Sequence, residues 1–87
     1  METFRTDEEL YRVVRDLASR LEARGHAHAA ARLRDGFSSL NGLTDGWAMF
    51  LDSVESVWTT ASKGFDPEDR DALERIRTAA HAVVHRR

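Results

Sequence analysis

Apolar side chains recur once per helical turn in four separate stretches of this 87-residue chain, and residues that favour helix starts or stops lie between them. A stripe of this period places its apolar side chains on one face of an α-helix, and that face has to be buried against another element. The predicted helices cover approximately residues 7–24, 27–40, 45–61 and 67–85. We therefore expect an all-α fold, a small four-helix bundle with antiparallel or orthogonal packing, because the loops are short.

Local signals mark the predicted helix ends. Thr6 opens a sequence typical of a capping box. Gly25 can end the first helix in the left-handed conformation without a Cβ clash. Asp66 and Pro67 are typical of the N-cap and the first turn of the last helix. Gly36 lies inside the second helix and costs about 1 kcal/mol relative to Ala, so we expect a neighbouring helix to approach closely there.

Two tryptophans anchor the predicted core. Trp47 and Trp58 fall at almost the same angle on the third apolar stripe. An indole buries a large apolar area, which a domain of this size needs for stability. We therefore expect both tryptophans to pack inside the bundle.

Composition limits the classes of protein to which the chain can belong. The length allows one domain, residues 1–87, and a hydrophobic fraction of 41% is typical of folded globular proteins. Cysteine is absent, which excludes disulfides and Cys-ligated zinc. No apolar run approaches the ~20 residues that cross a bilayer, and the N-terminus shows no secretory signal. We expect a cytoplasmic protein without a membrane partner, with a layout that resembles many short bacterial helical proteins.

Acidic residues are concentrated in the middle of the chain. Residues 35–62 contain no Lys or Arg, and their charged side chains are Asp35, Asp45, Asp52 and Glu55. An acidic surface of this kind would steer a basic partner surface towards it. It has the wrong sign for phosphates, so nucleic-acid binding is not expected.

The outer face of the third predicted helix is the candidate interaction surface. It is rich in Ser and Thr, and Met49 is a large apolar side chain that projects away from the stripe. Hydroxyl side chains cost little to cover, and methionine adapts to varied contacts. The candidate partner-binding residues are Asp45, Met49, Asp52, Ser53, Ser56 and Thr60. The leading hypothesis is a small non-enzymatic adaptor, regulator or antidote-like protein that binds another protein. A homodimer formed through the same face is an alternative.

A second alternative is weak metal binding through Glu74, His81 and His85. The two histidines lie four residues apart on the last helix, so their imidazoles can reach one zinc or nickel ion. The simpler interpretation is two exposed histidines that suit the negative end of a helix dipole. Asp and Glu fall on the solvent side of all four helices, and no Gly-rich phosphate loop or activated nucleophile is found. No catalytic residue and no cofactor is therefore predicted.

Overall fold

A computed structural model describes residues 7–40 and 46–85. Within these ranges the chain forms only helices, without a strand, and the predicted all-α four-helix bundle is confirmed. The elements are α1 (Asp7–Ala23), α2 (Ala27–Ser38), α3 (Gly46–Ala61), the short 3-10 helix η1 (Ser62–Gly64) and α4 (Pro67–His85). The predicted ends differ from the observed ones by two residues at most. The predicted cap at Thr6 and the candidate residue Asp45 lie outside the described ranges.

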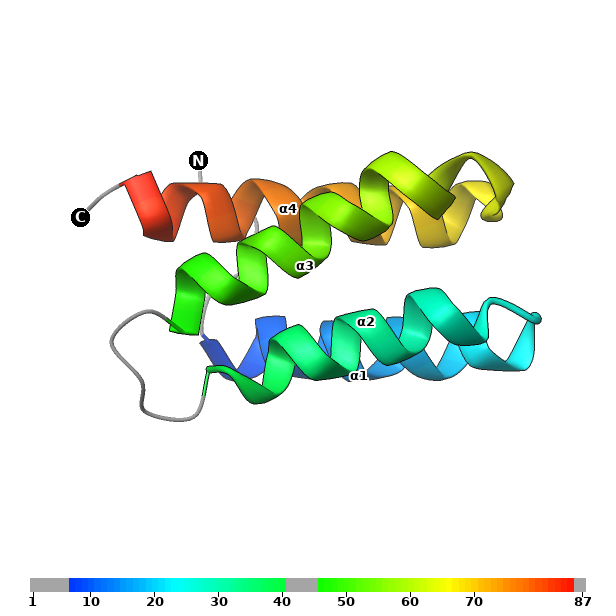
Figure 1. The fold of residues 1–87 in the computed structure, drawn as a ribbon, viewed down its shortest axis with the longest axis horizontal. Helices are drawn as coiled ribbons and strands as arrows, with labels where there is room; N and C mark the ends of the chain where they lie inside the picture. Colours follow the sequence, from blue (N-terminus) through cyan, green and yellow to red (C-terminus); the bar gives the residue numbers. More distant parts are fainter. Residues whose placement is uncertain (1–6, 41–45, 86–87) are drawn as a thin grey trace.

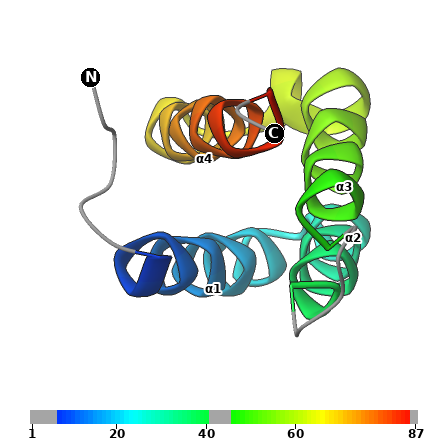
Figure 2. The ribbon, with the colours of Figure 1, turned by 90° about the vertical axis from the view of Figure 1, so that its left-hand side faces the viewer.

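The four helices run alternately back and forth along the long axis of the molecule (Figure 1). Viewed along that axis, α1 and α2 lie below, α3 rises beside them, and α4 returns above α1 (Figure 2). Each helix contacts the next one in the chain, and α4 also contacts α1. Gly25 has a φ of +89° in the turn between α1 and α2, as predicted. None of the described helices combines the length and apolar character that a membrane span requires.

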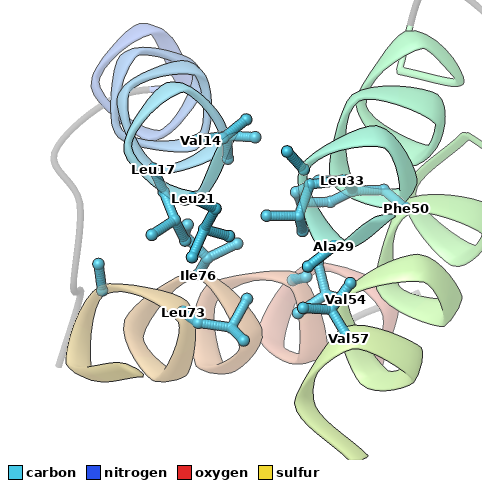
Figure 3. Packing of buried hydrophobic residues seen from close by; sticks show 14 of the residues in the cluster. Val14, Leu17, Leu21, Ala29, Leu33, Phe50, Val54, Val57, Leu73 and Ile76 are labelled. Carbon is cyan, nitrogen blue, oxygen red and sulfur yellow. The ribbon is translucent and has the colours of Figure 1, made fainter. Parts of the chain in front are cut away.

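The apolar stripes of all four helices meet in one core, shown close up in Figure 3. The largest side chains with almost no exposed surface are Phe50, Leu17, Leu21, Leu33, Leu73, Ile76, Val14, Val54 and Val57. Trp47 and Trp58 pack against this core as expected, but they lie at its edge and are only partly buried. The guanidinium groups of Arg70 and Arg77 lie 5.7 and 5.4 Å from the Trp58 ring centroid. These long side chains cover the indole on its outer side.

A buried ion pair joins the end of α1 to the start of α4. Asp69 has no exposed surface, and its carboxylate accepts hydrogen bonds from Arg20 Nε at 2.9 Å and Arg24 Nη1 at 2.5 Å. Arg24 Nη1 also lies 2.8 Å from Asp66. The expectation that every acidic residue faces solvent is therefore wrong at Asp69. Two guanidinium groups, from Arg20 in the last turn of α1 and from Arg24 just after it, compensate the desolvation of this carboxylate.

Candidate functional site

A groove of about 410 Å³ follows the seam between α2 and α3. Its lining residues are Arg32, Asp35, Gly36, Ser39, Ala48, Met49, Asp52 and Ser53. Three of the predicted partner-binding residues, Met49, Asp52 and Ser53, thus lie in one place. The α2 side of the groove could not be predicted from the pattern of one helix face.

At the floor of the groove, α2 and α3 approach each other closely. A Cβ atom built on Gly36 would lie 2.5 Å from both Cβ and Oγ of Ser53. The predicted close approach of a neighbouring helix at Gly36 is confirmed. Only small side chains fit at such a crossing, so the groove has a floor of glycine and serine.

Ser53 belongs to this floor and not to an outer surface. Its exposed fraction is 3%, so the expectation that Ser53 lies on the exposed face of the third helix is wrong. Ser53 is buried because α2 reaches across the edge of the α3 apolar stripe where Gly36 lacks a side chain. The glycine inside the second predicted helix was the sequence signal for this contact, but it did not identify the residue opposite.

Met49 lines the groove with a largely exposed side chain. Its exposed fraction is 50%, and it is the exposed large hydrophobic residue of the described part of the chain. The prediction that Met49 projects away from the core is confirmed. A flexible thioether chain at the mouth of a groove is a suitable first contact for an apolar partner group.

Charged groups of both signs lie beside Met49. Arg32 reaches across the groove, with Nη2 at 3.6 Å from Asp52 Oδ2 and Nη1 at 3.9 Å from Asp35 Oδ2. The Asp52 and Asp35 side chains are 82% and 76% exposed. Ion pairs this long and exposed contribute little to stability, so both carboxylates remain available to a partner.

Glu55, another acidic residue of the central segment, forms hydrogen bonds with side chains of the neighbouring helix α4. Its Oε2 atom accepts hydrogen bonds from Arg77 Nε at 2.9 Å and His81 Nε2 at 2.7 Å, both on α4. Partial burial raises the pKa of Glu55, but the hydrogen bonds and positive charge of His81 and Arg77 outweigh it, so the pKa lies below its usual value. Glu55 therefore ties α3 to α4 and contributes little free charge to the surface.

The remaining candidate residues lie away from the groove. Ser56 is partly buried, and Thr60 is exposed with its hydroxyl donating to the Ser56 carbonyl at 2.7 Å. Neither residue is among those that line the groove. The predicted interaction surface is thus divided, with Met49, Asp52 and Ser53 in the groove and Ser56 and Thr60 outside it.

The residues of the metal hypothesis are not brought together. The rings of His81 and His85 lie 5.0 Å apart, but His81 Nε2 is bound to Glu55. Glu74 instead lines a separate shallow pocket beside Trp58. Within residues 7–40 and 46–85, no group of three His, Asp or Glu side chains is arranged to hold a metal ion. The Arg77 guanidinium against Glu55 would also repel a cation from this position.

Comparisons with protein-family models, curated proteins and solved structures found no match to this chain. Function therefore has to be inferred from the residues themselves. The groove offers one adaptable apolar side chain, two accessible carboxylates, one guanidinium group and a floor of small residues. Such a combination supplies contact area and charge recognition to a protruding group of another molecule.

Proposed function

We propose that this protein is a small interaction module that receives a segment of a partner protein in the groove between α2 and α3. The exposed Met49 side chain carries the proposal, because it lies beside a concave surface into which an apolar group can fit. Covering Met49 removes apolar surface from water and supplies a favourable term for binding. An adaptor, regulator or antidote-like role, without catalysis, fits such a surface.

The groove also indicates the chemistry of the partner segment. Asp35 and Asp52 are highly exposed and lie on both sides of the seam, so a basic side chain is favoured between them. The groove volume of about 410 Å³ leaves room for a short apolar side chain. We infer that the preferred segment carries one Arg or Lys next to one apolar residue.

Selection from a displayed library of random peptides tests this proposal. Peptides enriched on the wild-type protein should combine a basic and an apolar residue, and binding should shift the Met49 methyl resonance in NMR spectra. Met49→Lys should abolish binding, because it places a charge where an apolar contact is needed. Asp35→Asn with Asp52→Asn should slow association and reduce its salt dependence.

Glu68 provides the matched control. It is an exposed carboxylate on α4, in a pocket lined by α1 and α4 residues, away from the groove. Glu68→Gln should leave peptide binding unchanged. Enriched peptides that bind equally well to wild type and to the Met49→Lys variant would contradict the proposal, as would a library without enrichment.

A further inference from the structure

The groove is itself lined by one basic and one apolar side chain, the two kinds of group expected of its partner. Met49 is an exposed apolar side chain, and Arg32 is a basic side chain. Both lie in the same groove as the carboxylates of Asp35 and Asp52. The surface therefore carries groups of both charges and an apolar side chain, so it is complementary in charge to a copy of itself.

Resting on the proposed function, we infer that the occupant of the groove is a second copy of this chain, related by a two-fold axis. In such a dimer the same patch is used by both copies, and every contact is made twice. Met49 of each copy would enter the other groove, over the small residues Gly36, Ala48 and Ser53. The two methionines would cover each other from water at the centre of the interface.

Arg32 can exchange the carboxylates of its own copy, Asp35 and Asp52, for the same carboxylates of the second copy. Within one copy it lies 3.6 and 3.9 Å from its two carboxylates, distances at which the ion pairs are loose. Across a two-fold axis each guanidinium would meet the carboxylates of the other copy in a surface that excludes water. Opposite charges attract more strongly there than they do when exposed to solvent.

The size of the molecule limits the area of the dimer interface, and thereby the affinity that we expect for the dimer. Its largest face measures at most 34 by 25 Å. A standard interface buries about 800 Å² on each partner, so the whole α2–α3 face would be required for a dimer of ordinary stability. We therefore expect a reversible dimer with a Kd on the order of micromolar.

Sedimentation velocity of the 87-residue chain tests the inference, at concentrations from about 0.1 to about 500 µM that bracket this Kd. Wild type should convert from monomer to dimer over that range. Met49→Lys should weaken the dimer by at least about tenfold. Glu68→Lys, a charge change on the α1–α4 side, should have no effect. A wild-type monomer throughout the range would overturn the inference, and so would a dimer that Met49→Lys leaves intact.

A charge exchange gives a second, independent measurement. Arg32→Asp makes the groove wholly acidic, and Asp35→Arg with Asp52→Arg makes it wholly basic, so each variant alone should be monomeric. Their equimolar mixture should form a heterodimer more tightly than wild type pairs with itself, because all charges across the interface are then opposite. Circular dichroism of each variant verifies the helical fold. A mixture that stays monomeric would contradict the inference.

These outcomes separate the dimer from the proposed function. If wild type is monomeric but selected peptides bind it through Met49, the second copy is excluded and the interaction module stands. If the chain neither dimerises through the groove nor binds peptides there, both proposals fail. If groove variants abolish the dimer, the second copy is supported as the occupant.

Discussion

The carboxylate of Asp69 accepts a hydrogen bond from Arg20 Nε at 2.9 Å, across 49 residues of sequence. The two side chains differ sharply in burial, since Asp69 has no exposed surface and Arg20 is 41% exposed. Arg24, in the turn that follows α1, completes the contact. Without its partners the carboxylate would be an uncompensated buried charge, whereas the arginines would regain water.

Removing the arginines should therefore destabilise the fold more than removing the carboxylate. Arg20→Ala with Arg24→Ala leaves Asp69 buried and unpaired, with an expected loss of about 3–5 kcal/mol in the free energy of unfolding. Asp69→Ala should cost about 1–3 kcal/mol, because the two arginines become solvated. Urea unfolding followed by circular dichroism measures both values.

The exposed pair of Arg34 and Glu22 is the control for this comparison. Its atoms lie 2.8 Å apart, with side chains 48% and 58% exposed. Glu22→Ala should change the free energy of unfolding by less than about 1 kcal/mol. A larger loss for Asp69→Ala than for the double arginine variant would show that burial of the carboxylate does not control the energetics of this contact.

Gly36 should be intolerant of even one methyl group. Alanine is the better helix former by about 1 kcal/mol, but its Cβ would lie 2.5 Å from Ser53 and force α2 and α3 apart. We expect Gly36→Ala to lower the free energy of unfolding by about 1–3 kcal/mol. Chemical unfolding measures the loss. Ser53→Gly in the same chain should recover part of it, since it removes the atoms that clash.

Gly64 is the matched glycine for this experiment. A Cβ atom built there would lie 3.7 Å from Cε1 of the His26 ring, an ordinary contact distance. Gly64→Ala should therefore be close to neutral. Equal effects of alanine at positions 36 and 64 would exclude helix crowding as the reason for the glycine at the groove floor.

The helices and their order could be predicted because they depend on local periodicity and on capping residues. Gly25 and Met49 were predicted correctly for the same reason, since each follows from its position within one element. Ser53 was not, because its burial depends on how closely α2 approaches at Gly36. The angle of a residue on one helix does not determine where a second helix crosses it.

The ion pairs of Asp69 and Glu55 could not be predicted for a similar reason. Their partners come from other helices, 49 residues away for Arg20 and 22 for Arg77. A helix wheel places both acids away from the centre of an apolar stripe, and it contains no information about a guanidinium group on the adjoining helix. The free acidic surface predicted for the central segment is smaller than expected because Glu55 is bound in this way.

The burial of Ser53 can be tested against Ser56, a serine one turn along α3. Ser53 is 3% exposed and faces α2, whereas Ser56 is only partly buried. Ser53→Leu should overpack the crossing and cost about 1–3 kcal/mol, and Ser56→Leu should change stability much less. Thermal unfolding of the two variants provides the measurement. The opposite order would place Ser53 on the outer face after all.

Glu55 should make the stability of the bundle depend on pH. Its pKa in the folded protein lies below its usual value, since the hydrogen bonds and positive charge of His81 and Arg77 outweigh the effect of burial. The unfolded chain therefore binds the proton more readily. The stabilisation from Glu55 is present above the pKa of the unfolded state and is lost as the pH falls through the folded pKa.

Glu55→Gln should consequently lower the free energy of unfolding at pH 7, and the difference from wild type should shrink as the pH falls from about 5 towards 3. Urea unfolding at a series of pH values measures this difference. In a chain that already carries Arg77→Met and His81→Gln, the same substitution should have little effect, because the groups that lower the pKa are gone. A difference that stays constant down to pH 3 would mean that the charge of Glu55 contributes nothing to holding α3 against α4.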